Sequence, residues 1–175
     1  MARVSGGDRM EAALTALAAK VARPGTLRVG FLEGATYPLG TARAVRARYA
    51  KRKAKGVTGA MRGAAGTPAV AMVAAIQEFG APSRGIPPRP FFRNMVRAKS
   101  PEWPAALAAL LEASNWDAVR ALRLAGEAIA GQLRQSIRDT NSPPLAASTI
   151  ARKGFSKPLI DTGHLFASVD YEVKE

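Results

Sequence analysis

A long apolar stripe at helical spacing, in the second half of the chain, constrains the fold more than any other feature. It runs from position 119 to position 137 without a proline. This period predicts an amphipathic helix that must bury one face. Ser114 or Asn115 is expected to cap the helix, and Asn141-Ser142-Pro143-Pro144 ends it after about Asp139. The stripe consists of Val119, Leu122, Gly126, Ile129, Leu133 and Ile137. The small Gly126 predicts a close crossing with another helix.

Shorter elements are predicted on both sides of this helix. In chain order, they are an amphipathic helix with Met10, Leu14, Leu17 and Val21 on one face, ended by Pro24-Gly25; an alternating strand from Leu27 to Phe31; a helix capped by Thr67, with Val70, Val73, Ile76 and Phe79 as its apolar face and Gly80 as its stop; a stiff connector over 86–92; a helix from Phe91 to about Ala98; a helix started by Ser100-Pro101; a weak helix from Leu145 to Arg152; and a strand from Phe166 to Val173.

These elements predict an α+β fold. A small antiparallel sheet is expected to pack against one long helix and several shorter helices, with a long basic loop outside them. The chain has 175 residues, which is enough for one domain with its own core. We therefore expect residues 1–175 to form a single domain, with a basic, Gly-rich loop or insertion over residues 34–66.

The basic loop is the strongest electrostatic signal in the sequence. No Asp or Glu lies between Glu33 and Glu78, and the whole chain has a net charge of +13 and a pI near 11.1. Such a segment attracts polyanions without reading sequence, because no base-reading motif accompanies it. Contact with duplex DNA and docking onto acidic neighbouring proteins both remain open. The candidate residues are Arg43, Arg46, Arg48, Lys51, Arg52, Lys53, Lys55 and Arg62.

Residues with catalytic potential are few. Asp161-Thr162-Gly163 is the triplet of aspartic proteases, but those enzymes need two such carboxylates and a long chain after the triplet, whereas twelve residues follow Gly163 here. Asp161 and Gly163 are instead expected to shape a turn. His164 is the one histidine, and the chain has no cysteine. We predict a protein that is not an enzyme and that needs no metal and no cofactor.

No stretch of the sequence approaches the ~18 consecutive apolar residues of a membrane-spanning helix. The start of the chain also lacks the pattern of a secretory signal, because its apolar run from Ala12 to Ala19 is short and lies between Glu11 and Lys20. We therefore expect no membrane partner.

Two segments carry a resemblance to a known group of proteins. The first block comprises Val73-Ala74-Ala75-Ile76-Gln77-Glu78-Phe79-Gly80 and Ile86-Pro87-Pro88-Arg89-Pro90-Phe91-Phe92; the second block comprises Ser148-Thr149-Ile150-Ala151-Arg152-Lys153-Gly154, Lys157-Pro158-Leu159-Ile160-Asp161-Thr162-Gly163-His164-Leu165 and Ser168-Val169-Asp170-Tyr171. In order and spacing they resemble the signature of tailed-phage tail-completion and virion-morphogenesis proteins, which join head to tail.

The resemblance implies a structural neck protein without a catalytic site. Such a subunit forms a homo-oligomeric ring, often of six copies, around the DNA channel between the head connector and the tail tube. It implies a location in the virion, with assembly in the host cytoplasm. Its expected partners are further copies of itself, the neighbouring connector or head-completion and tail-tube proteins, and packaged double-stranded DNA. Six or twelve copies, the tail type, the host, and a place at the tail end or nearer the head all stay open.

The motif residues also have expected physical roles. Pro87 and Pro90 flank Arg89 on a rigid arm, which suits a bidentate contact with a carboxylate in the same chain or a neighbour. Glu78 is expected to support contacts within or between subunits, and Phe91 and Phe92 to fill core or interface. The set of assembly or structural residues is Glu78, Phe79, Gly80, Pro87, Arg89, Pro90, Phe91, Phe92, Asp161, Thr162, Gly163 and Leu165. An alternative function is a free, sequence-independent DNA-binding accessory protein that acts through residues 43–62.

Overall fold

The computed structural model describes residues 7–21, 25–37 and 69–174. Their elements, in chain order, are α1 (Gly7–Val21), β1 (Thr26–Gly30), α3 (Val70–Phe79), the 3-10 turn η1 (Pro82–Arg84), α4 (Phe91–Lys99), the 3-10 turn η2 (Ser100–Glu102), α5 (Trp103–Ala113), α6 (Ala118–Asp139), α7 (Ala147–Lys153), α8 (His164–Ala167) and β2 (Asp170–Lys174). The fold is α+β, as predicted, while the predicted basic loop falls almost entirely outside these residues.

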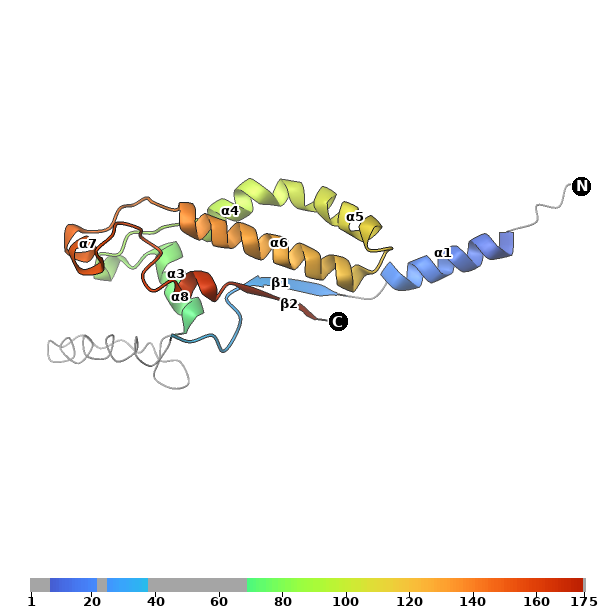
Figure 1. Ribbon diagram of the computed structural model, residues 1–175, viewed down its shortest axis with the longest axis horizontal. Helices are drawn as coiled ribbons and strands as arrows, with labels where there is room; N and C mark the ends of the chain where they lie inside the picture. The colour runs from blue at the N-terminus through green and yellow to red at the C-terminus, as the bar shows by residue number, and fades with distance from the viewer. Residues whose placement is uncertain (1–6, 22–24, 38–68, 175) are drawn as a thin grey trace, which may run out of the picture.

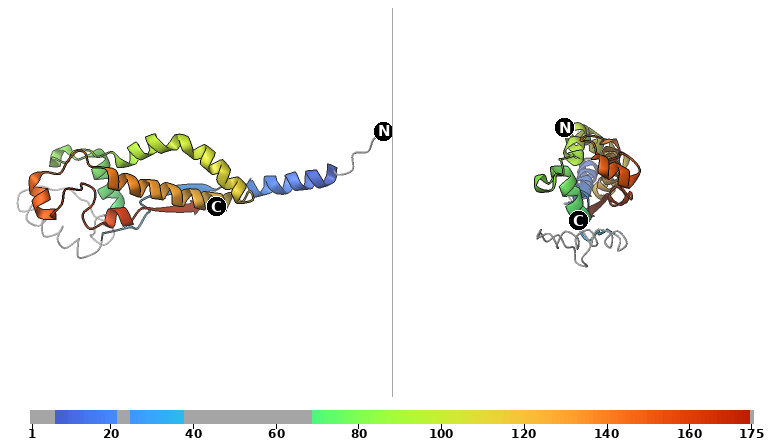
Figure 2. Two further views of the ribbon diagram at one scale, coloured as in Figure 1. Left: turned by 45° about the horizontal axis from the view of Figure 1, so that its top comes forward. Right: turned by 90° about the vertical axis from the view of Figure 1, so that its left-hand side faces the viewer.

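Helix α6 is the centre of the molecule. Helices α4 and α5 lie along one side of it and the sheet lies along the other (Figure 1). The sheet consists of β1 and β2, which pair antiparallel with Gly30 opposite Asp170 and Thr26 opposite Lys174. Strands from the two ends of the described chain therefore meet on one helix. Figure 2 shows α3, α7 and α8 gathered at one end of α6 and α1 extending from the other.

The core lies where α3, α4, α6 and α8 meet. Phe91, Leu133 and Ile137 are among its largest fully buried side chains. Three of the predicted stripe positions, Gly126, Leu133 and Ile137, are buried on α6, together with Ala121 and Ala130. The buried cluster is Val70, Ala74, Phe91, Met95, Ala130, Leu133, Ile137, Leu159, Leu165 and Val169.

Gly126 does not mark a helix crossing, so that prediction was wrong. It lies against the sheet: a Cβ atom at this position would come within 2.4 Å of the Tyr171 ring and 2.8 Å of Leu27. The absence of a side chain allows β1 and β2 to approach the helix backbone.

The predicted helix starts need correction at three places. Asp117, and not Ser114 or Asn115, caps α6, because its backbone is extended and its carboxylate accepts a hydrogen bond from the Arg120 N–H at 3.0 Å. Ser100 is not a cap, because its backbone is helical and the chain continues from α4 through η2 into α5. Helix α3 begins after Ala69 without a side-chain cap. The predicted cap, Thr67, lies outside the described residues.

The closing strand is shorter than predicted. Gly163 has a φ of 75°, and the chain then enters α8, whose Ala167 N–H donates to the Gly163 carbonyl at 2.9 Å. Leu165 in this turn and Val169 just after it are both buried. The prediction of a strand that begins at Phe166 was therefore wrong, and the strand comprises residues 170–174.

Candidate functional site

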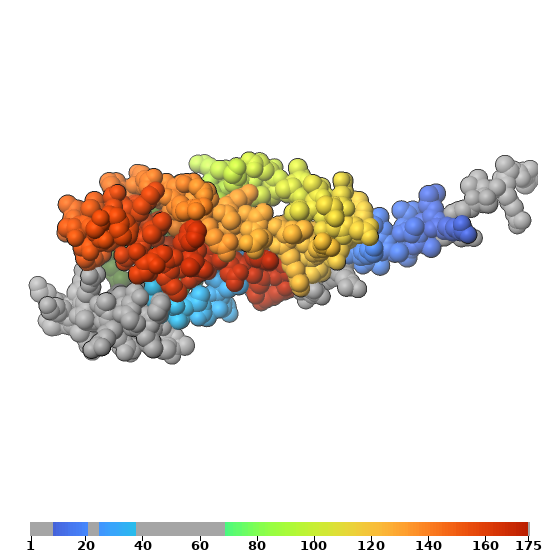
Figure 3. Space-filling model, viewed as in Figure 1, coloured from blue at the N-terminus to red at the C-terminus, as the bar shows by residue number. Residues whose placement is uncertain are grey.

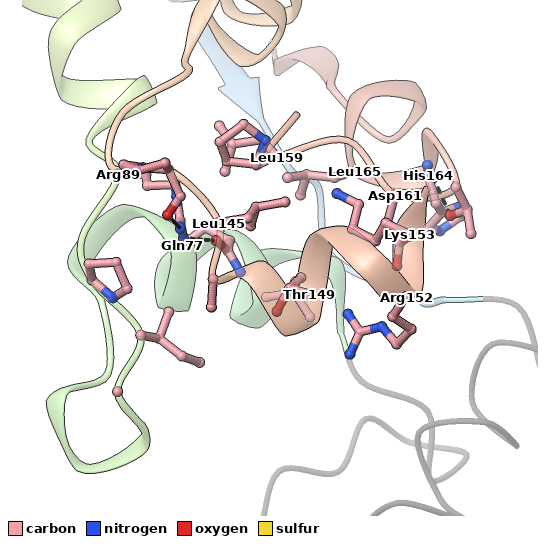
Figure 4. A pocket seen from close by; sticks show the side chains of 18 of the residues that line it. Gln77, Arg89, Leu145, Thr149, Arg152, Lys153, Leu159, Asp161, His164 and Leu165 are labelled. Carbon is pink, nitrogen blue, oxygen red and sulfur yellow. Dashed lines mark hydrogen bonds between the residues drawn. The ribbon is translucent and has the colours of Figure 1, made fainter. Parts of the chain in front are cut away.

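A cavity of about 740 Å³ lies where the two blocks meet, at the α3–α7–α8 end of the molecule. Figure 4 shows side chains from both blocks facing it. The walls are apolar in part, and the charged and polar groups lie at two ends, Arg89 with Gln77 at one and Arg152, Lys153, Asp161 and His164 at the other (Figure 4). Representative lining residues are Gln77, Arg89, Leu145, Lys153, Asp161 and His164. Blocks separated by more than fifty residues in the sequence thus form one site.

Arg89 joins the first block to the turn that follows α6. It is 4 % exposed. Its Nε donates to the Pro143 carbonyl at 2.9 Å, its Nη2 to the Pro144 carbonyl at 3.2 Å and its Nη1 to the Gln77 side-chain oxygen at 3.2 Å. Burial lowers the pKa of the guanidinium from its ordinary value, because removal from water disfavours the charged form.

The predicted carboxylate partner of Arg89 within its own chain was wrong, while a carboxylate of a neighbouring copy stays a prediction. Its guanidinium meets neutral oxygens and not a carboxylate. Prolines at 143 and 144 have no N–H to donate, but their carbonyls accept, and the turn presents both of them to the fork of donors. Arg89 therefore acts as an internal latch between two parts of one chain.

Glu78 holds the start of α4. It is 4 % exposed, and its two carboxylate oxygens accept from the Phe92 N–H at 2.9 Å and the Arg93 N–H at 3.1 Å. These are unpaired donors at a helix N-terminus, where a negative charge is favoured by the helix dipole. The Arg93 Nε also donates to Glu78 at 2.8 Å. The predicted intra-subunit contact of Glu78 is confirmed.

The aromatic residues of the first block differ in how deeply they are buried. Phe91 is 1 % exposed and belongs to the core, whereas Phe92 is half-buried. Phe79 is 64 % exposed, so its predicted place on the buried face of α3 was wrong, and Arg93 lies over its ring at 4.9 Å. The exposed ring follows from the period of α3, which buries positions 70, 74 and 78.

Three residues of the first block shape the connector. Gly80 has a φ of 77° and lies so close to the Pro88 nitrogen that a Cβ would stand 2.8 Å away. Pro87 lines the cavity, and Pro90 occupies the N-cap position of α4. The predicted connector over 86–92 is non-helical up to Pro90, whereas Phe91 and Phe92 already belong to α4; its stiffness stays a prediction.

The turn at Asp161-Thr162-Gly163 forms another wall of the cavity. Gly163 has the predicted positive φ, and Leu165 is 4 % exposed in the core. The turn contact is made by Thr162, whose hydroxyl accepts from the His164 N–H at 3.4 Å, and Asp161 is exposed. Gly163 therefore shapes the turn as expected, whereas the side-chain contact expected of Asp161 is made by Thr162.

His164 connects this turn to the base of the basic loop. Its Nε2 lies 3.0 Å from the Thr36 carbonyl oxygen, and its ring lies 4.7 Å from the Tyr37 ring. Thr36 also bridges Ala69, while the Val70 N–H donates to the Ala35 carbonyl at 2.9 Å. The two ends of segment 38–68 are thus held side by side next to the cavity. The eight predicted cations of that segment lie outside the described residues.

Lys153 is a site residue that the sequence reasoning did not select. Its Nζ donates to the Lys157 carbonyl at 2.6 Å and to the Ile160 carbonyl, so it folds the second block back on itself. Burial, together with the nearby Arg152 and Arg89, lowers its pKa, while Asp161 acts in the opposite direction. Lys153 precedes Gly154, which ends α7 with a φ of 81°. A lysine before a helix-ending glycine was the available signal.

The chemistry of the site is that of a cationic, half-apolar recess. Lys153 and the exposed Arg152 suit an acidic or carboxylate-bearing group, Asp161 is the one carboxylate among the lining residues, and the apolar walls suit aliphatic side chains. Among residues 7–21, 25–37 and 69–174, no cluster of three His, Asp or Glu side chains is arranged to hold a metal ion. In the same ranges, no helix combines the length and the apolar character that a membrane span requires.

Comparisons of this chain with protein-family models, with curated proteins and with solved structures found no match.

Proposed function

We propose that this protein is a structural subunit of the tailed-phage neck, of the tail-completion or tail-terminator type. In this proposal, copies form a ring around the DNA channel and join the head connector to the tail. The observation that supports it is that the residues of the two blocks serve to hold parts of the chain together. Arg89 and Glu78 make internal latches, and the turn at Gly163 leads the second block into α8 beside the cavity that both blocks line.

The sheet offers a surface for assembly. It has two strands in the described part of the chain, and α6 is the helix that packs against both. Each strand of an antiparallel pair has one edge directed away from its partner, with backbone groups that can pair with another strand. Strands added across subunits would give a head-to-tail contact, which closes into a ring when the rotation between copies allows it.

The first test measures the mass of the purified protein by light scattering at low and high salt, with negative-stain electron microscopy. We expect a closed ring of defined copy number that persists at high salt. Antibody labelling of intact particles should place the protein at the head-to-tail joint. A label elsewhere on the particle, or no label, would refute the proposal.

The same experiment addresses the DNA-binding alternative. A monomer that binds duplex DNA at low salt and loses it at high salt would favour that reading. Replacement of the eight cations between Arg43 and Arg62 by serine should then abolish the binding. DNA binding that survives this change would exclude the basic loop as the contact.

A further inference from the structure

The cavity between the two blocks carries an excess of positive charge that its own walls do not balance. Arg89, Arg152 and Lys153 are the cations of its lining, and Asp161 is the one carboxylate. In the described part of the chain, no carboxylate lies within ion-pair distance of any of the three cations. The cavity therefore attracts negative charge from outside its own walls.

Arg89 is the most deeply buried of these charges. It is 4 % exposed, and its described hydrogen bonds all go to neutral oxygens, the Pro143 and Pro144 carbonyls and the Gln77 side chain. A guanidinium has five N–H groups, so this latch leaves donors over. Neutral acceptors satisfy donors without cancelling a charge, and a buried charge without an opposite charge is costly. The burial that lowers the pKa of Arg89 agrees with this account.

The cations at the other end of the cavity act on one another. Burial is the main cause that lowers the pKa of Lys153; Asp161 acts in the opposite direction, while Arg152 and Arg89 lower the pKa further. The Lys153 ammonium spends two of its three N–H groups on backbone carbonyls of the second block, and Arg152 is exposed. An anionic group that entered the cavity would therefore be attracted from both ends.

The apolar walls distinguish among the anions that such a cavity could take. Leu145, Leu159 and Leu165 lie between the two charged ends in Figure 4, and Val73 and Ile86 also line the cavity. A phosphate group has no apolar surface to bury against them, whereas a peptide with acidic and aliphatic side chains matches both the charge and the walls. Figure 3 shows the second block, orange to red, at the surface of this end of the molecule, where a partner can reach it.

We propose that this cavity binds an acidic peptide segment of a different protein, with carboxylates toward the two cationic ends and aliphatic side chains against the leucines. A second copy of the chain is a poorer match. It has 26 Lys and Arg residues against 13 Asp and Glu residues, so it would bring more positive than negative charge to the site. The neck function would make the partner a neighbouring neck or tail protein, and in that identification alone the inference rests on the proposed function.

The absence of cysteine from the chain allows a single thiol to report on the cavity. Thr149→Cys places a thiol on the cavity lining, and Ser148→Cys places one at an exposed position of the same helix, α7. Each full-length variant is labelled with a maleimide in the presence of a pool of short peptides in which glutamate alternates with leucine, isoleucine or valine. We expect the pool to slow labelling of the Thr149 variant several-fold and to leave labelling of the Ser148 variant unchanged.

Two control pools separate the effect of charge from the effect of apolar burial. Glutamine in place of glutamate should weaken the protection about tenfold or more, because hydrogen bonds to charged groups are lost. Serine in place of the aliphatic residues should weaken it about tenfold, because the leucine walls lose their contacts. Inorganic phosphate and duplex DNA, added as other anions, should give no protection.

A matched pair of exposed arginines tests the cationic lining. Arg152→Gln removes one cation of the cavity, and Arg97→Gln removes the same charge from the exposed face of α4. In the Thr149→Cys background, the first change should weaken binding of the acidic pool about two- to fivefold, the range for one exposed ion pair. The second change should leave binding as it was. Because both side chains are exposed, both variants should keep the urea midpoint of the parent.

Equal protection by the glutamate and glutamine pools, equal protection of both thiols, or no protection would overturn the inference. Protection by phosphate or DNA would overturn it by assigning the cavity to a phosphate. Protection of the Thr149 thiol on self-assembly would overturn it by assigning the cavity to a second copy. Antibody labelling of particles separates these failures from failure of the proposed function. A protein at the head-to-tail joint that ignores the acidic pool retains the neck proposal, whereas an acidic-peptide binder absent from the joint retains only the inference.

Discussion

Two glycines of α6 allow a paired test of how closely the sheet packs on this helix. Gly126 and Gly131 lie five residues apart in the interior of one helix. Without other contacts, Gly→Ala in a helix interior stabilises a protein by about 1 kcal/mol, because alanine restricts the unfolded chain more. At Gly131 a new Cβ would meet nothing within 4 Å, so this gain should be realised in full.

At Gly126 the same methyl group would collide with the sheet. It would come within 2.4 Å of Cδ2 and 2.8 Å of Cγ of Tyr171, and within 2.8 Å of Leu27 Cδ1. Comfortable carbon contacts lie near ~3.5–4.0 Å. Cγ and Cδ2 are close to the root of the Tyr171 side chain, so the ring cannot simply swing away and β2 must move. Overpacking of this severity costs roughly 3 kcal/mol. After the gain in helix propensity, Gly126→Ala should destabilise the protein by about 2 kcal/mol.

The assay is urea denaturation followed by circular dichroism, at one protein concentration because assembly affects apparent stability. The midpoint of the Gly131 variant should rise and that of the Gly126 variant should fall, with unchanged slopes. Their free energies of unfolding should differ by about 3 kcal/mol. Equal midpoints, or a more stable Gly126 variant, would refute the close contact between α6 and Tyr171.

Three further predictions follow from the latches and the cavity. Glu78→Ala should lower the free energy of unfolding by about 3 kcal/mol, since two N–H groups at the start of α4 lose a charged acceptor. As a control, Arg93→Ala should cost less than about 1 kcal/mol in the same denaturation assay, because the Arg93 side chain is 57 % exposed. Arg89→Lys should cost about 1–3 kcal/mol and should speed proteolysis after α6, because one ammonium cannot reach all three oxygens. Burial, and secondarily Asp161, raises the pKa of Tyr37 above its ordinary 10.0. Above pH 10 the unfolded chain therefore releases the phenolic proton first and stability falls; Tyr37→Phe should reduce that fall, and an unchanged slope in denaturation midpoints against pH would contradict it.

The elements predicted most accurately were those set by local chemistry. The helix ending at Gly80, the non-helical connector before Phe91 and the end of α6 before the prolines are all present. Glycine and proline act through their own backbone restrictions, which do not depend on distant residues. The predicted strand Leu27–Phe31 is present with a shift of one residue, as Thr26–Gly30. Its alternating sequence matches a strand that is buried on one face.

The errors occurred where one local signal competed with another. Ser100, Ser114 and Asn115 all resemble helix caps, yet the chain uses Asp117 and runs through Ser100 as helix. Cap residues are also common in turns and in helix ends, so their identity alone does not choose among neighbouring positions. Likewise, Phe166 and Ala167 fit the start of an alternating strand but belong to the helical turn of α8, whose Leu165 is buried.

The sequence by itself determined the α+β class, the long central helix and several of the residues that line the site, although not Lys153. The tertiary structure decided which of them meet: Arg89 with the Pro143 and Pro144 carbonyls, Glu78 with the start of α4, and His164 with the base of the basic loop. Periodicity and turn chemistry act over a few residues and can therefore be recognised in the amino-acid sequence. Partners separated by fourteen to 128 positions depend on how α3, α6 and α8 pack, which the local pattern does not encode.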